Sequence, residues 1–195
     1  MKETYNGAIY IIGPDHKKYY KPNLNFLKDR FDNVLVIGDG ENDILDTHNE
    51  GPLQKIKTIA QDYPEFSNEG KILVYIETHG VAWDNTHYIQ TAKDNIIASK
   101  ELFKLLAENI KTPIDIIFTP CNGKAALTDI DVLPKDSRVI IFSDFDQITN
   151  AQNIASTLNT LPKDSFILNN FYNHYLAGVF SMNESPVCIL LEERL

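Results

Sequence analysis

Short runs of apolar, largely β-branched residues recur along the chain, and segments with helical spacing separate most of them. The expected strands cover residues 8–12, 34–37, 72–76, 114–118, 138–142 and 187–191. The expected helices cover residues 23–31, 52–63, 99–110, 150–158 and 170–180. Strands that alternate with helices form βαβ units and a parallel sheet. The pattern therefore predicts a three-layer α/β domain, in which helices flank a mostly parallel sheet of about six strands.

Local signals support two of the helix starts and one hairpin. Pro52 suits the first position of a helix, where its missing N–H costs little, and Ser99 is a favourable N-cap residue. Residues 124–137 are expected to form a loop. Residues 83–97 are polar and are compatible with a small hairpin around residues 88–89. With 195 residues and no linker-like segment, the chain is expected to form a single domain over residues 1–195.

The overall negative charge argues against two classes of binding partner, nucleic acids and anionic membranes. The chain carries a formal net charge of -9, and 43% of its residues are hydrophobic. Surfaces that bind nucleic acid or anionic membranes need clustered Lys and Arg, so we expect neither partner. A negative total is compatible with a basic substrate, although it is also common in soluble proteins. No apolar run approaches the roughly 20 residues of a membrane-spanning helix.

The number and spacing of the cysteines indicate the kind of cellular compartment in which the protein works. Cys121 and Cys188 are the two cysteines of the chain, and the sequence contains neither a CxxC pair nor a disulfide framework. Residues 1–7 contain no apolar core of a signal peptide. We therefore expect a reducing, cytoplasmic location, with secretion by other routes left open. Cys188 lies in an apolar run and is interpreted as a packed thiol.

Two of the expected strands stop at a reactive side chain. The strand at residues 72–76 leads into His79, and the strand at residues 114–118 leads into Cys121. A cysteine attacks as the thiolate, and an imidazole can accept its proton. Functional residues of open α/β sheets gather at the carboxyl ends of the strands. If the two strands are neighbours, His79 and Cys121 share one edge of the sheet and form a cysteine-nucleophile site.

Each of these residues also has a simpler interpretation. A histidine at a strand end is commonly a solvated bystander, and a free cysteine is commonly a packing residue. Gly80 and Gly123 follow the two strands closely, and turns after strands also favour glycine. The joint placement of His79 and Cys121 at two successive strand ends favours a functional pair. In that case the N–H groups of Gly80 and Cys121 are suited to stabilise an oxyanion.

The two strand endings resemble a known group of enzymes. An apolar strand ending in His-Gly, followed by an apolar strand ending in Cys with a Gly close behind, is typical of the caspase-like cysteine peptidases. These include caspases, metacaspases, legumains, gingipains and clostripain. The motifs stand here at residues 74–80 and 116–123, and residues 9–39 are similar to the start of legumains. Thr78, Thr119 and Pro120 depart from the residues that are usual in the family, but none of them removes a catalytic group.

The resemblance implies a peptidase mechanism. Cys121 would attack the scissile carbonyl, His79 would protonate the leaving amine, and the N–H groups of Gly80 and Cys121 would hold the oxyanion. This family requires no third side chain to orient its dyad. The competing interpretation is a catalytically inactive relative, or another doubly wound α/β domain that binds or signals. Faster alkylation of Cys121 than of Cys188 would favour the enzyme.

The resemblance also suggests where substrate specificity is set. The family builds part of its S1 pocket after the strand that follows the nucleophile strand, and that segment here contains Ser143, Asp144 and Asp146. Carboxylates at this place would pair with Lys or Arg at P1. A solvated acidic turn before a helix explains the same residues equally well. Specificity for Asp would need a pocket arginine, for which Arg30 and Arg138 are the candidates.

The sequence predicts no metal and no cofactor. Residues 39–46 are acidic, but their glycine is misplaced for an EF-hand, so a solvated loop is favoured and calcium is the weaker alternative. A zinc site made from His79, Cys121 and either His87 or His174 lacks ligand spacing on any local element. The predicted partner is therefore a peptide or protein substrate. The sequence makes no prediction of the oligomeric state.

Overall fold

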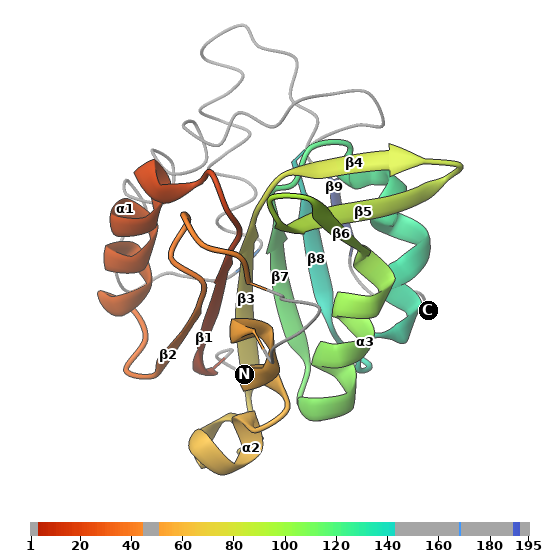
Figure 1. The fold of residues 1–195 in the computed structure, drawn as a ribbon. Helices are drawn as coiled ribbons and strands as arrows, with labels where there is room; N and C mark the ends of the chain where they lie inside the picture. The colour runs from red at the N-terminus through yellow and green to blue at the C-terminus, as the bar shows by residue number, and fades with distance from the viewer. Residues whose placement is uncertain (1–3, 45–50, 143–167, 169–188, 192–195) are drawn as a thin grey trace, which may run out of the picture.

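The described part of the chain contributes six strands to the main sheet. A computed structural model of the chain describes residues 4–44, 51–142, 168 and 189–191. The strands are β1 (Tyr5–Ile12), β2 (Val34–Ile37), β3 (Lys71–Glu77), β7 (Ile114–Phe118), β8 (Arg138–Ile141) and β9 (Ile189–Leu191). Their order is β2-β1-β3-β7-β8-β9 (Figure 1). β9 runs antiparallel to β8, whereas the other neighbouring pairs are parallel, which confirms the predicted sheet.

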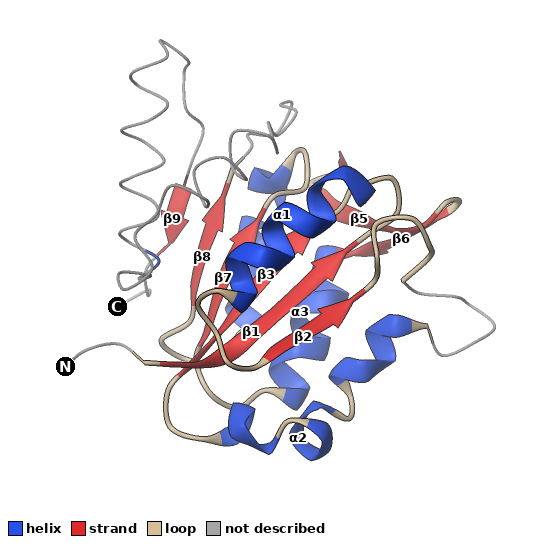
Figure 2. Ribbon diagram, turned by 90° about the vertical axis from the view of Figure 1, so that its left-hand side faces the viewer, coloured by secondary structure: helices blue, strands red, loops and turns tan. Residues whose placement is uncertain are grey.

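Helices cover both faces of this sheet. The helix α1 (Lys17–Lys28) lies on one face, and α3 (Ser99–Asn109) lies on the other (Figure 2). The shorter helical segments are η1 (Pro52–Ile56), α2 (Ile59–Asp62), η2 (Pro64–Ser67) and η3 (Gly123–Val132). Phe26 of α1 belongs to one apolar core, while Phe103 of α3 belongs to a second core on the opposite face, together with residues of all four short segments. The architecture is the predicted three-layer α/β fold.

Side-chain alternation explains why the central strands are apolar at nearly every position. Successive residues of a strand point to opposite faces. Ile9 and Ile11 of β1 join the core that includes α3, whereas Ala8 and Tyr10 join the core that includes α1. A strand that is covered on both faces therefore needs apolar residues throughout. Glu77 at the end of β3 and Asp115 in β7 are exceptions, because each is fully buried despite its charge.

A small antiparallel sheet projects from the carboxyl end of β3. It consists of β4 (Gly80–Trp83), β5 (Thr86–Ala92) and β6 (Asn95–Ala98) in that order (Figure 1). Asp84 and Asn85 connect β4 to β5 with φ values of 48° and 60°. Two-residue hairpin turns favour this left-handed conformation, and Asp and Asn tolerate it. The expected hairpin exists, but its turn lies at Asp84-Asn85, and residues 88–89 lie inside β5.

Two helix assignments and one loop assignment made from the sequence were wrong in detail. The helix expected at residues 52–63 is divided into η1 and α2, and the loop expected at residues 124–137 contains η3. Short 3₁₀ segments follow i to i+3 hydrogen bonds, so the 3.6-residue period does not reveal them. The helix expected at residues 23–31 begins earlier, at Lys17, although Pro22 lies inside it. The helices expected at residues 150–158 and 170–180 lie outside the described residues.

None of the helices in the described part of the chain is both long enough and apolar enough to cross a bilayer.

Candidate active site

The strands that lead to His79 and Cys121 are direct neighbours. β3 pairs with β7 in parallel, with Ile76 opposite Phe118. The pairing continues one step further, because the N–H of Thr119 donates to the carbonyl oxygen of Ile76 at 3.1 Å, and the Thr119 hydroxyl donates to the same oxygen at 2.9 Å. Both candidate residues therefore follow the carboxyl ends of adjacent parallel strands, at one edge of the sheet.

Gly80 brings the backbone after His79 against the backbone of Cys121. A Cβ atom at position 80 would overlap the carbonyl oxygen of Cys121, and would lie 2.7 Å from Cβ of Pro120 and 2.9 Å from Nε2 of His87. Two of these three obstacles belong to the turn after β7, so a side chain at position 80 would force the two strand ends apart. A glycine is therefore required here for close packing.

Cys121 lies in a turn that leaves it partly accessible. It is a free cysteine of intermediate exposure, whereas Phe118 of the preceding strand is fully buried. The next residue, Asn122, adopts a left-handed conformation with φ 59° and leads into η3. Asn is one of the few residues that tolerate this conformation. The turn thus presents the thiol at the edge of the sheet instead of packing it into the core.

His87 contacts the backbone of Cys121, a relationship that sequence reasoning missed. Its Nε2 lies 2.8 Å from the carbonyl oxygen of Cys121, and its Nδ1 lies 2.6 Å from Oγ of Ser99. A carbonyl oxygen only accepts, so Nε2 carries the proton, and in the neutral ring Nδ1 accepts from the Ser99 hydroxyl. Burial lowers the pKa of His87, which favours this neutral form. The one signal in the sequence is the alternation of β5, which places His87 on the same inward face as buried Ile89.

Ser99 therefore has a different role from the expected one. It is the first residue of α3, the N-cap is Ala98, and no side chain caps the helix. The hydroxyl that was expected to cap the helix is bonded to buried His87 instead.

The imidazole of His79 packs against a second histidine. His79 is solvent-exposed, and its ring centroid lies 4.5 Å from that of His16 with the ring planes inclined at 61°. Partial burial lowers the pKa of His79, the charge of His16 lowers it further, and Asp15 opposes both effects. The net direction favours a neutral imidazole near pH 7, which is the form that can accept a thiol proton.

No metal centre is evident among the described residues, where no group of three or more His, Cys, Asp or Glu is arranged to hold an ion. In the acidic loop at residues 39–43, Asp39 accepts hydrogen bonds from the N–H groups of Glu41 and Asn42, both at 2.9 Å. These bonds lower the pKa of Asp39. The carboxylate of Asp39, which was considered as a calcium ligand, thus stabilises the conformation of the loop to which it belongs.

The predicted S1 residues Ser143, Asp144 and Asp146 lie outside the described residues. The two arginines considered for Asp specificity are described. Arg138 is the first residue of β8, and Arg30 follows the end of α1 with its guanidinium 4.1 Å from the ring centroid of Phe26. Both positions belong to the edge where the parallel strands begin, so neither arginine is near His79 and Cys121.

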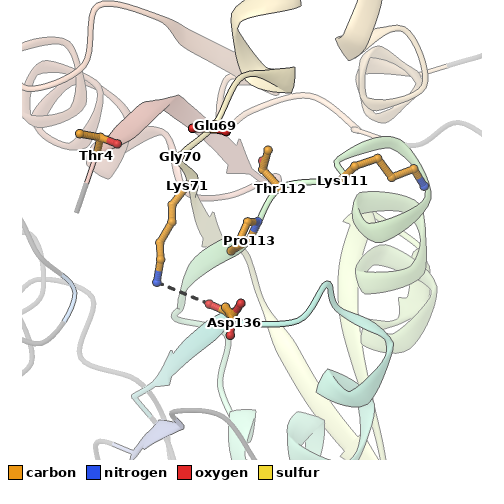
Figure 3. Close-up of a pocket in the computed structure, with 8 residues that line it drawn as sticks. All are labelled: Thr4, Glu69, Gly70, Lys71, Lys111, Thr112, Pro113 and Asp136. Atoms are coloured by element: carbon orange, nitrogen blue, oxygen red, sulfur yellow. Dashed lines mark hydrogen bonds between the residues drawn. The ribbon is translucent and has the colours of Figure 1, made fainter. Parts of the chain in front are cut away.

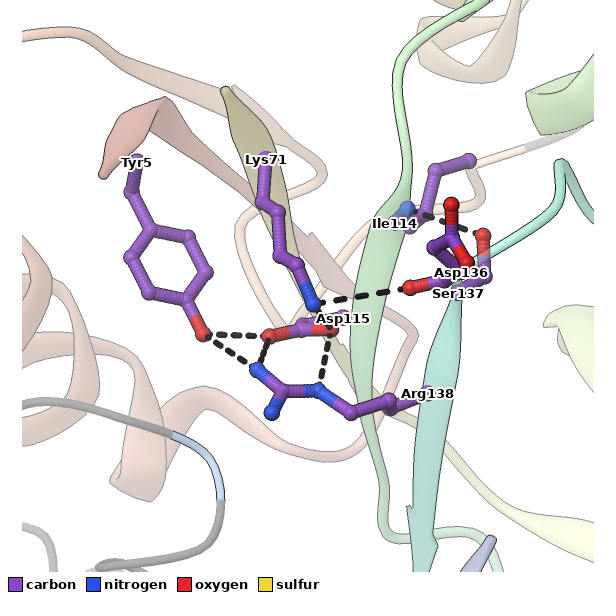
Figure 4. A network of polar contacts seen from close by, with 7 residues as sticks. All are labelled: Tyr5, Lys71, Ile114, Asp115, Asp136, Ser137 and Arg138. Carbon is purple, nitrogen blue, oxygen red and sulfur yellow. Dashed lines mark hydrogen bonds and ion pairs between the residues drawn. The ribbon is translucent and has the colours of Figure 1, made fainter. Parts of the chain in front are cut away.

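A pocket and a network of charged side chains lie at the edge where the parallel strands begin, opposite the edge of His79 and Cys121. The pocket has a volume of about 510 Å³, and Lys71 and Asp136 are among the residues that line it (Figure 3). Beside it, fully buried Asp115 forms a bidentate ion pair with Arg138 and accepts a hydrogen bond from Tyr5 (Figure 4). Lys71 Nζ lies 3.6 Å from Asp115 Oδ1. This network ties the beginnings of β1, β3, β7 and β8 together.

Comparison with known proteins assigns the fold. Neither a family model nor a curated protein matches the sequence. Among solved structures, the Drosophila initiator caspase Dronc is similar, with a TM-score of 0.61 at 10% identity over 95% of this chain and 79% of Dronc. The structure of drICE is similar with a TM-score of 0.56 at 15% identity, over 97% of this chain and 89% of drICE. The chain has the caspase fold. This confirms the caspase-like fold that the two strand endings predicted.

Proposed function

We propose that this caspase-fold protein is a cysteine peptidase in which Cys121 is the nucleophile and His79 is the general acid and base. The observation that carries the proposal is the parallel pairing of β3 with β7, together with the packing of Gly80 against Cys121. This arrangement gathers a partly exposed thiol and an accessible imidazole at one sheet edge. The caspase fold supports the same assignment.

In the proposed reaction, His79 accepts the thiol proton while Sγ of Cys121 attacks the carbonyl carbon of the scissile peptide bond. The N–H groups of Gly80 and Cys121 donate to the oxyanion of the tetrahedral intermediate. His79 then donates its proton to the leaving amine, the C–N bond breaks, and a thioester remains. Water hydrolyses the thioester and restores the thiol.

We also propose that the substrate is a peptide or protein with a basic P1 residue. The net charge of -9 favours the approach of a cationic substrate. Asp144 and Asp146, with Ser143, are the residues assigned to S1, as in the sequence-based prediction. A thiol nucleophile suits a reducing compartment such as the cytoplasm.

The test is cleavage of a peptide library by the wild type and by Cys121→Ala, with Cys188→Ala as the matched control. We expect Cys121→Ala to abolish hydrolysis, Cys188→Ala to retain it, and His79→Ala to reduce it by at least ~100-fold. Iodoacetamide should label Cys121 much faster than Cys188. If no peptide is cleaved and the two thiols react alike, the alternative of an inactive caspase-fold binding domain replaces the peptidase.

Specificity is tested on matched peptides that differ only at P1. Asp144→Asn or Asp146→Asn should lower kcat/KM for P1-Arg by on the order of 10- to 100-fold, because a cationic side chain would lose its charged partner. The same variants should leave P1-Asn peptides unaffected. A wild-type preference for P1-Asn or P1-Asp would refute the basic specificity without affecting the assignment of Cys121.

A further inference from the structure

A buried carboxylate lies close in the sequence to His79, the candidate general acid and base. Glu77 ends β3, two residues before His79, and is fully buried. Its Oε2 accepts hydrogen bonds from the Tyr10 hydroxyl at 3.0 Å and from Nδ2 of Asn23 at 2.5 Å. Burial raises the pKa of Tyr10, and the charge of Glu77 raises it further, so the phenol stays protonated and can donate. One oxygen of Glu77 is therefore held by two donors from β1 and α1.

The other oxygen of Glu77 faces His16. Oε1 of Glu77 has no hydrogen-bond partner, and Nδ1 of His16 lies 3.7 Å from it. His16 is 9% exposed, and neither of its ring nitrogens has a hydrogen-bond partner. Burying a charge without a partner is costly. A protonated His16 would supply the counter-charge that this carboxylate oxygen otherwise lacks.

The backbone holds His16 firmly in this place. His16 follows Asp15, which adopts a left-handed conformation with φ 65°. The N–H groups of His16 and Lys17 both donate to the carbonyl oxygen of Gly40 at 3.0 Å. The loop after β1 is thereby tied to the loop after β2, and the ring of His16 is directed between Glu77 and His79.

His16 therefore connects the buried carboxylate to His79. Its ring lies against Glu77 at one side and meets the ring of His79, with centroids 4.5 Å apart, at another. The closeness of the rings restricts the rotation of His79, and a charge on His16 disfavours a second positive charge on His79.

We propose that Glu77 and His16 are positioning residues for His79: the contact with the Glu77 carboxylate fixes the ring of His16, and the ring of His16 in turn orients the ring of His79. The proposal rests on the proposed function, in which a neutral His79 accepts the thiol proton of Cys121. The charge of Asp15 also acts on His79, in the direction opposite to that of His16. Buried His87 is hydrogen-bonded to the Cys121 carbonyl.

The test follows the titration of His79 itself, which requires no turnover. The Cε1–H resonance of His79 is followed by NMR against pH in Cys121→Ala protein, and is assigned by its loss in His79→Gln. Adding His16→Phe retains a ring against His79 and removes the charge. The midpoint of His79 should then rise by about 0.5 pH unit or more, because a like charge has been removed. Glu41→Gln is the matched control, since Glu41 is exposed and pairs with Lys17, and it should leave the midpoint unchanged.

A double-mutant cycle tests the role of Glu77. In a Glu77→Gln background, His16→Phe should shift the His79 midpoint by less than half as much, because His16 then lacks its counter-charge. His16→Gln, which is also uncharged, replaces His16→Phe if that variant does not fold. An unchanged His79 midpoint in a folded, uncharged His16 variant would overturn the proposal, as would an equal shift in both backgrounds.

The test of the positioning role and the test of the peptidase function can fail independently. If His79 shifts as expected but no peptide is cleaved, the positioning relationship holds and the peptidase assignment fails. If peptides are cleaved and the His79 midpoint does not move, the dyad acts without His16 and Glu77. In an active enzyme, His16→Phe should move the acid limb of the kcat/KM profile to higher pH by the same amount as the NMR midpoint.

Discussion

The buried imidazole of His87 is hydrogen-bonded to the backbone of Cys121, with 2.8 Å between Nε2 and the carbonyl oxygen. β5 therefore supports the turn that presents the thiol, although His87 lies 34 residues away in the sequence. On its other side the same ring is bonded to Ser99 at the start of α3. One neutral histidine thus joins the small sheet, a helix and the candidate nucleophile.

Replacing His87 should loosen this turn. His87→Phe leaves the Cys121 carbonyl and the Ser99 hydroxyl without partners, so the free energy of unfolding should fall by about 1–3 kcal/mol. Alkylation of Cys121 should also change in rate. His87→Gln, whose amide can donate from a similar position, should restore part of both effects. Urea unfolding and iodoacetamide kinetics measure them, and equal behaviour of the two variants would contradict the role of the hydrogen bond.

Stability should decrease in mild acid. The pKa of His87 in the folded protein lies below its value of about 6.5 in an unfolded chain, so protonation favours unfolding. The contribution is complete above pH 6.5 and decreases as the pH falls toward the folded-state value, by up to about 1.4 kcal/mol per pH unit. Urea unfolding from pH 7.5 to 5.5 measures this slope. His87→Gln should have a shallower slope, and an unchanged slope would exclude His87 as its source.

Gly80→Ala should separate the two strand ends. Its Cβ would overlap the Cys121 carbonyl oxygen and lie 2.7 Å from Cβ of Pro120. Because one of these atoms belongs to the backbone, the turn itself would have to shift to make room. Overpacking of this kind costs typically about 1–3 kcal/mol of stability, and the displacement should also slow alkylation of Cys121. Val81→Ala is the control, because Val81 is the next residue and is 44% exposed. A Gly80→Ala protein as stable and reactive as this control would refute the tight contact.

Asp115→Asn should destabilise the fold without acting directly on the candidate site. The substitution leaves Arg138 buried without its carboxylate partner, at a typical cost of about 3–5 kcal/mol. Asp115 lies near the beginning of β7, whereas Cys121 follows its end. Below the unfolding transition, the alkylation rate of Cys121 should therefore equal that of the wild type. A large change in this rate in fully folded protein would show that the two edges of the sheet are coupled.

Hydrophobic patterning was sufficient to predict the sheet. β3 and β7 are buried along almost their whole lengths. Each therefore appears in the sequence as a mainly apolar run that is followed by polar residues, with Asp115 as the one charged residue inside β7. The end of each run marks the carboxyl edge of a parallel sheet, which is why the apolar runs alone place His79 and Cys121 at one edge. The prediction of one helix at residues 52–63 was wrong because the same apolar spacing is compatible with short 3₁₀ segments.

The sequence by itself determined the α/β class, the strand ends and the placement of His79 and Cys121 after two neighbouring strands. These features follow from burial patterns within single segments and from the tendency of consecutive parallel strands to be neighbours. Only the tertiary structure decided what surrounds them. The contact of His87 with Cys121, and that of His16 with both Glu77 and His79, join segments that are distant in the sequence. A buried polar side chain takes its partners from whichever segments pack around it, and no local period records which these are.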